Sequence, residues 1–174
     1  MRNAFTIIEL LVVIAIIVML AVLLLIVIKP QEQLAKSRDS GKISAVNQLG
    51  KSVTYYQATR GGNLPNELNW AHALTVSSDL RTIPAGIKYR SSGVDPCMTN
   101  PVPNTNPTYC YDRIDPMGHD AIVFSRLEAG AYNTKCSAPQ VAYFAYSTAD
   151  ARDGFICSNG DPVAWGRGDM VYLD

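Results

Sequence analysis

The stretch that decides the fold is LLVVIAIIVMLAVLLLIVI, residues 10–28, which Glu9 precedes and Lys29 follows. These 19 consecutive residues include no charged or strongly polar side chain, and neither Gly nor Pro. A helix needs about 20 such residues to cross the hydrocarbon core of a bilayer, so the run predicts a membrane-spanning helix. A cleaved secretory signal is the alternative. It would require a small-residue cleavage site after the run, and KPQEQ at residues 29–33 is not one.

Composition bounds the rest of the chain. The 174 residues suffice for one domain with a core. Lys plus Arg and Asp plus Glu both number 15, so the formal net charge is zero. No chain-wide electrostatic attraction to nucleic acid or anionic lipid follows from this balance, and we predict no nucleic-acid partner.

The cysteines indicate an oxidising compartment. The four cysteines, Cys97, Cys110, Cys136 and Cys157, form no CxxC pair, and only two histidines accompany them, so a zinc site has little support. An even number beyond a membrane segment predicts two disulfides. Three pairings exist, and we favour Cys97–Cys110 with Cys136–Cys157 because it closes two short loops. Four buried thiols in a reducing compartment are the alternative.

Glu9 is unusual because it places a carboxylate at the start of the apolar run. Carboxylates near hydrocarbon are costly and are usually paired or functional. Cleavage just before Phe5 would release a short leader that ends in Ala4. The new amino terminus could then neutralise Glu9 of a neighbouring helix. Alternatively, Glu9 lies among lipid headgroups and needs no partner.

Residues 4–17, AFTIIELLVVIAII, resemble the class III signal of type IV prepilins and pseudopilins. The resemblance implies that a prepilin peptidase cuts between Ala4 and Phe5 and methylates the new amino group of Phe5. It further implies that Glu9 pairs with a neighbouring subunit's amino terminus during assembly. The family usually has Gly where this chain has Ala4, and many members carry Gly or Pro inside the apolar helix.

After Pro30 the pattern changes to that of an amphipathic helix that ends near residue 60. Its apolar stripe falls largely at spacings of three and four: Ala35, Ile43, Val46, Leu49, Val53 and Tyr56. Its predicted polar face contains Lys36, Arg38, Asp39, Lys42, Gln48 and Lys51. Gly41 and Gly50 each weaken a helix by up to about 1 kcal/mol relative to Ala.

A near-continuous helix over residues 5–60 would be about 84 Å long. A head of about 110 residues cannot cover that length, given the size of compact domains. The apolar half must therefore enter a bilayer or pack against other copies of the same helix. A plain single-span anchor is the alternative.

The rest of the chain predicts a small antiparallel sheet. Strands are expected at residues 109–114, 121–127, 141–147, 154–157 and 169–173, with a turn at 115–118. A short helix within residues 64–76 would bury Trp70, Ala73 and Leu74, and residues 83–106 read as an irregular loop. We predict an α+β, pilin-like fold divided into a leader (1–4), an apolar helix (5–29), an amphipathic helix (30–60) and a head (61–174).

The sequence offers little for catalysis. His72 and His119 are isolated, and no GxSxG, HExxH, Walker A or GxGxxG motif occurs, so we predict a protein that is not an enzyme. Asp150 and Asp153 are weak calcium candidates in an acidic loop, for which a hairpin turn is the simpler interpretation. We predict no other cofactor.

These features predict a structural subunit of a type IV pilus-like filament. It would begin as a single-pass precursor in the inner membrane and end in an extracellular or periplasmic filament. Its expected partners are other copies of itself, the prepilin peptidase and a pilus or secretion assembly machinery. A pseudopilin of type II secretion is the alternative within this class. A membrane-anchored adhesin or binding domain that never polymerises is the alternative from another class.

Overall fold

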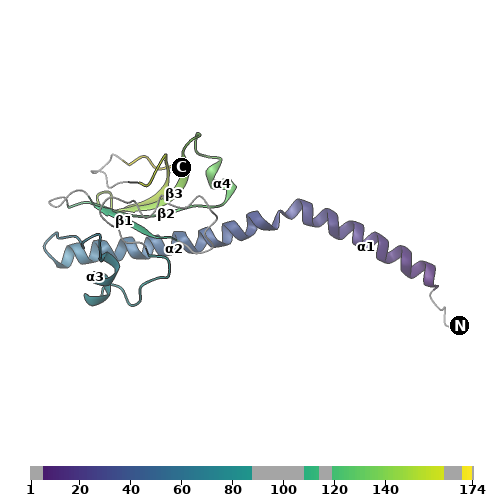
Figure 1. Cartoon of the computed structure of the whole chain (residues 1–174), viewed down its shortest axis with the longest axis horizontal. Helices are drawn as coiled ribbons and strands as arrows, with labels where there is room; N and C mark the ends of the chain where they lie inside the picture. Colours follow the sequence, from purple (N-terminus) through teal and green to yellow (C-terminus); the bar gives the residue numbers. More distant parts are fainter. Residues whose placement is uncertain (1–5, 88–107, 114–118, 163–169, 174) are drawn as a thin grey trace.

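Two helices in series form the long axis of the molecule, seen in a computed structural model (Figure 1). The structure describes residues 6–87, 108–113, 119–162 and 170–173, apart from the side chains of residues 27 and 28. Helix α1 covers Ile7–Ile28 and helix α2 covers Pro30–Thr59. Lys29 separates them with a left-handed backbone (φ 46°, ψ 69°), and Pro30 has no N–H to continue the hydrogen-bond pattern of α1. The expected near-continuous helix is therefore two helices.

In its described residues, the head combines one sheet with two short helices. The elements are α3 (Trp70–Val76), β1 (Cys110–Arg113), β2 (Ala121–Arg126), α4 (Gly130–Asn133), β3 (Val141–Ser147) and β4 (Arg152–Ser158). All neighbouring strands are antiparallel, in the order β1-β2-β3-β4. The sheet lies along one side of α2 and α3 lies on the other (Figure 1). The predicted α+β class with an antiparallel sheet is thus confirmed.

The main core lies between the sheet and α2. Four residues of the predicted α2 stripe are buried: Ala35, Val46, Leu49 and Val53. Ile43 and Tyr56 are half-buried and pack at its margin. From the sheet, Tyr111, Val123, Phe144 and Tyr146 meet this stripe. The apolar periodicity of α2 therefore predicted the face that binds the sheet.

A second core lies on the other face of the sheet. It consists of Cys110, Ile122, Phe124, Tyr143, Ala145, Ile156 and Met170. Side chains of a strand alternate between faces, and both β2 and β3 are apolar at nearly every position, so both faces become buried. The apolar stripe of α2 accounts for only one of these two packed faces.

Two further expectations are revised in the head. In α3 the buried residues are Trp70, Ala71 and Leu74, so Ala71 takes the place predicted for Ala73. In the described part of the 169–173 segment, only Leu173 pairs with the sheet, through an isolated bridge to Phe155. The turn at 115–118 and most of the loop at 83–106 lie outside the described residues.

Candidate functional site

The amino-terminal end of α1 is held by a capping box between Thr6 and Glu9. Thr6 has an extended backbone, and its Oγ1 accepts a hydrogen bond from the Glu9 N–H at 3.3 Å. In return, Glu9 Oε2 accepts hydrogen bonds from the Thr6 N–H and the Thr6 hydroxyl, both at 2.9 Å. Thr6 was not predicted as a cap, although the Thr-x-x-Glu spacing is the sequence signal for this motif.

The capping box fixes the position of the Glu9 carboxylate. A negative charge in the first turn of a helix interacts favourably with the helix dipole, so the Glu9 carboxylate is stabilised at this end of α1. Both hydrogen bonds end on Oε2, and Oε1 accepts none from the described residues. The predicted cleavage and methylation residues, Ala4 and Phe5, lie outside the described residues.

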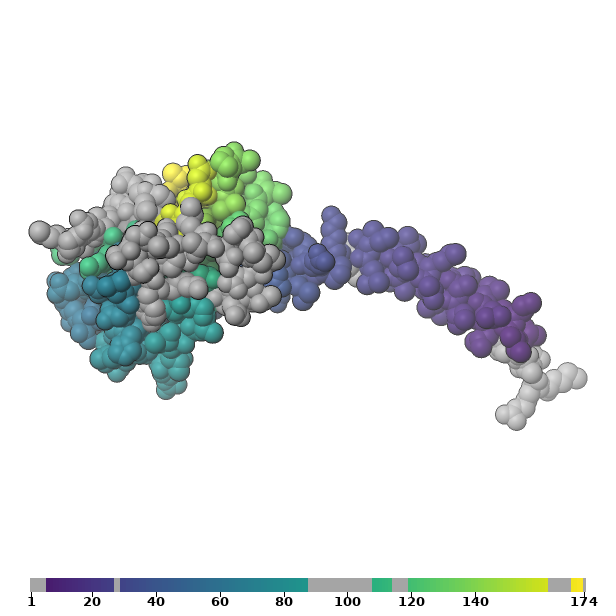
Figure 2. All heavy atoms as spheres, in the orientation of Figure 1, coloured from purple at the N-terminus to yellow at the C-terminus, as the bar shows by residue number. Residues whose placement is uncertain are grey.

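Helix α1 presents apolar side chains in every direction. Residues Ile7–Ile26 are long and apolar enough to cross a membrane, and the rest of the described chain buries none of this segment. The exposed fractions of its large apolar residues run from 46% at Val13 to 81% at Ile7. At 1.5 Å per residue, the 22 residues of α1 span about 33 Å, the thickness of a hydrocarbon core. Figure 2 shows α1 as a bare rod that projects from the head.

A polar cluster attaches α2 to the segment that follows β2. Asp39 is fully buried, and its carboxylate accepts hydrogen bonds from the Glu128 N–H at 3.0 Å and the Ala129 N–H at 2.8 Å. Lys42 Nζ lies 3.5 Å from Asp39 Oδ1 and donates to Glu128 Oε1 at 2.7 Å. It also donates to the Arg126 carbonyl oxygen at 2.9 Å.

This cluster corrects the predicted polar face of α2. Asp39 and Lys42 were assigned to solvent, but they are 0% and 4% exposed. Arg38 remains exposed and donates from Nε and Nη2 to Glu128 Oε2, both at 2.8 Å. Periodicity alone marks charged residues as solvent-facing, and it contains no information about a distant segment that supplies their partners. Breaking such a buried pair typically costs about 3–5 kcal/mol.

Glu32 extends the attachment to the first turn of α2. Its two carboxylate oxygens accept the Gly130 N–H at 3.1 Å and the Ala131 N–H at 3.0 Å, at the start of α4. These two backbone donors hold the pKa of Glu32 below its usual value. Burial raises the pKa of Glu128, but hydrogen bonds from Lys42 and Arg38 outweigh it, so that pKa is also lowered. Both carboxylates are therefore stabilised in their ionised form.

The calcium candidates lie in and beside a hairpin. Asp150 is in the turn between β3 and β4, and its Oδ2 accepts a hydrogen bond from the Tyr172 hydroxyl at 3.3 Å. Asp153 lies in β4 opposite Tyr146. Across the described residues, no group of three or more His, Cys, Asp or Glu side chains could hold a metal ion. The hairpin turn predicted as the simpler interpretation is present.

The two histidines lie in different segments of the head. His119 Nδ1 is 3.1 Å from the Gly62 carbonyl oxygen, and the His119 carbonyl accepts a hydrogen bond from the Gln57 side chain. His119 therefore joins the segment before β2 to the carboxyl end of α2. His72 is exposed on α3.

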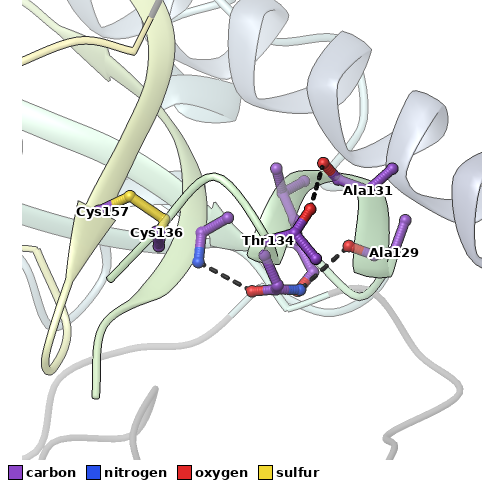
Figure 3. The surroundings of a disulfide bond; sticks show 8 residues. Ala129, Ala131, Thr134, Cys136 and Cys157 are labelled. Atoms are coloured by element: carbon purple, nitrogen blue, oxygen red, sulfur yellow. Dashed lines mark hydrogen bonds between the residues drawn. A yellow bond between two sulfur atoms is a disulfide. The ribbon is translucent and has the colours of Figure 1, made fainter. Parts of the chain in front are cut away.

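One disulfide is described completely. Cys136 bonds to Cys157 of β4 across a sequence separation of 21, with a Cα–Cα distance of 5.6 Å (Figure 3). This is one of the two disulfides in the favoured pairing. Figure 3 also shows the α4 region beside it, where the Thr134 hydroxyl donates to the Ala131 carbonyl oxygen at 3.3 Å. Cys110 is disulfide-bonded as well, and its predicted partner, Cys97, lies outside the described residues.

Comparison with known proteins found no match to this chain among protein-family models, curated proteins or solved structures. The resemblance of residues 4–17 to a prepilin signal therefore stands on the motif itself.

Proposed function

We propose that this chain is a pilin-like structural subunit that polymerises into a type IV pilus-like filament through α1. The observation that carries the proposal is an apolar helix of 22 residues that its own head leaves uncovered. Burial of one Leu, Ile or Val side chain is worth about 1.5–3 kcal/mol, so exposing all of α1 to water would cost on the order of tens of kcal/mol. Such a helix must always have an apolar surrounding.

Two surroundings meet this need at different stages. In the bilayer, lipid tails are as apolar as the helices, so the hydrophobic effect does not drive the copies together. Outside the bilayer, only other copies of α1 offer a matching surface, and each helix then buries the next. Leaving the membrane therefore requires work, which is the physical reason to expect an assembly machinery as a partner.

Glu9 would set the register of this packing. The Thr6–Glu9 capping box positions the carboxylate and leaves Oε1 without a bond from the described residues. The amino group of a processed Phe5 from a neighbouring copy would supply the missing donor. An unpaired carboxylate inside a bundle of apolar helices is penalised, so only the register that pairs Glu9 is favoured. Such a contact joins different surfaces of successive copies and therefore propagates.

Intact mass and amino-terminal sequencing of protein from its native membrane or filament fraction test the proposal. We expect the mature chain to begin at N-methylated Phe5. A chain that begins at Met1 in that fraction would refute the processing step and remove the partner proposed for Glu9.

Assembly is tested with Glu9→Leu, which keeps the apolar surface and removes the charge. We expect this variant to insert in the membrane but to form no filaments. Ile8→Leu, a neutral change at the neighbouring position, serves as the matched control and should assemble normally. Filaments from Glu9→Leu at the wild-type level would favour a tethered adhesin or binding domain.

A further inference from the structure

Strand β4 forms one edge of the sheet. It pairs with β3 at all seven positions from Arg152 to Ser158. Backbone groups in an antiparallel strand point alternately to its two sides. Asp153, Phe155 and Cys157 therefore present their backbone groups to the outer edge, as the Phe155 carbonyl does. An open edge of this kind is a template for pairing with another chain.

The protection within the sequence of β4 is confined to its two charged residues, Arg152 and Asp153, at its first two positions. Natural edge strands are commonly blunted by Lys, Pro or a bulge. RDGFICS, residues 152–158, contains neither Lys nor Pro, and its register with β3 is unbroken. If two copies of β4 paired antiparallel about Phe155, Arg152 would face Ser158 and Asp153 would face Cys157. No like charges would oppose this pairing.

The carboxyl-terminal residues Met170–Leu173, here called the edge strap, lie across this edge. The Leu173 N–H donates to the Phe155 carbonyl oxygen at 2.7 Å, at the central residue of β4. Met170 is 6% exposed and belongs to the second core together with Ile156. The edge strap is thus attached both to the strand and to the core beneath it.

Tyr172 provides the most specific contact of the edge strap. A Cβ at Gly154 would lie 3.2 Å from Cε1 of Tyr172 and closer still to Cδ1, so β4 has a glycine where the ring crosses it. The Arg152 guanidinium lies 4.3 Å from the ring centroid, and the Tyr172 hydroxyl donates to Asp150 Oδ2. These contacts hold the ring at the amino-terminal half of β4.

We propose that the edge strap keeps β4 from pairing with β4 of a second copy of this chain. The bridge at Phe155 leaves only residues 152–154 and 156–158 on either side. Each half is shorter than the five to six residues of a typical strand. This protection matters most where copies are crowded, and it does not depend on the proposed function, because it concerns the head alone.

Light scattering of the full chain in detergent micelles tests the proposal. Leu173→Pro removes the N–H that bonds to Phe155, and a chain that ends at Asp169 removes the whole edge strap. We expect the protein mass per particle to double in both variants. Val171→Ala is the matched control, since the Val171 side chain is 80% exposed, and it should keep the wild-type mass. All four proteins share α1, so association through α1 cannot produce the difference.

A second change identifies the contact. Asp153→Pro removes an outward N–H from β4, and proline is tolerated at sheet edges. Added to Leu173→Pro, it should restore the wild-type mass. A wild-type mass for Leu173→Pro, or a doubled mass that persists after Asp153→Pro, would overturn the proposal. If the truncated chain loses its circular dichroism signal, Leu173→Pro decides alone, because it leaves Met170 and Tyr172 of the edge strap in the chain.

Discussion

Gly50 and Gly41 both lie in the interior of α2, and the structure predicts opposite effects when each is replaced by Ala. A Cβ at Gly50 would lie 2.6 Å from the Cβ of Tyr146 and closer still to two ring carbons. Tyr146 is 5% exposed, and its hydroxyl accepts a hydrogen bond from Thr54 at 3.2 Å, so the ring has little freedom to move. A Cβ at Gly41 would meet nothing within 4 Å.

The magnitudes follow from two opposing terms. Ala in place of Gly favours a helix by up to about 1 kcal/mol, and this term acts at both positions. Overpacking a filled core costs about 1–3 kcal/mol, and contact with the Cβ of a fixed ring places Gly50 at the upper end. We therefore expect Gly50→Ala to lower the free energy of unfolding by about 2 kcal/mol and Gly41→Ala to raise it by about 1 kcal/mol.

Thermal unfolding of the full chain in detergent, followed by near-ultraviolet circular dichroism, measures both changes. For a chain of this size, 1 kcal/mol corresponds to about 2–4 °C in Tm. Gly50→Ala should lower Tm by about 4–8 °C, and Gly41→Ala should raise it by about 2–4 °C. An equal rise in both variants would refute the close approach of α2 to β3 at Gly50.

Three further predictions concern the attachment of the head. Asp39→Ala should destabilise the head by about 2–4 kcal/mol in chemical denaturation, because the Glu128 and Ala129 N–H groups lose their acceptor at about 1–3 kcal/mol each, although Lys42 keeps Glu128 as a partner. The exposed Ser40→Ala should change stability by less than about 0.5 kcal/mol. The lowered pKa values of Glu32 and Glu128 stabilise the fold fully above the unfolded value of 4.5, and this contribution is lost as the pH falls through their folded values. In the wild type, Tm should therefore decrease as the pH falls below 4.5, and the decrease should be smaller in Glu32→Gln. Equal decreases would show that the Glu32 carboxylate does not contribute to the stability of the fold. Replacing Cys136 and Cys157 together by Ser should cost about 3 kcal/mol, given the length of the closed loop, and unchanged unfolding would show that the bond contributes nothing to stability.

Much of the fold could be read from local patterns. The α2 stripe predicted the face that meets the sheet, because an apolar period near 3.6 places those residues on one side of any helix. Strands β2 and β3 were located because their β-branched and aromatic runs lie between turn residues. The capping box at Thr6 was also readable, since a helix cap depends on residues only three positions apart.

The role of several residues depended on segments far away in sequence. Gly50 reads as a weak point of a helix, and only the contact with Tyr146 explains why a side chain is absent there. The sequence pattern predicts Asp39 and Lys42 to be surface residues. Their partners lie 84 to 90 residues away, at the end of β2 and in the segment that follows it. For the same reason the second core was not predicted, and residues 169–173 were predicted as a strand although only Leu173 of the described residues pairs with the sheet.

The sequence by itself determined that residues 10–28 form an apolar helix in need of an apolar surrounding, because hydrophobicity and helix length are properties of the segment alone. Tertiary structure alone decided which charges on α2 are buried, where the helix approaches the sheet most closely and what covers the edge of β4. Those features depend on contacts between distant segments. Such contacts form only when the chain folds, and no local period encodes them.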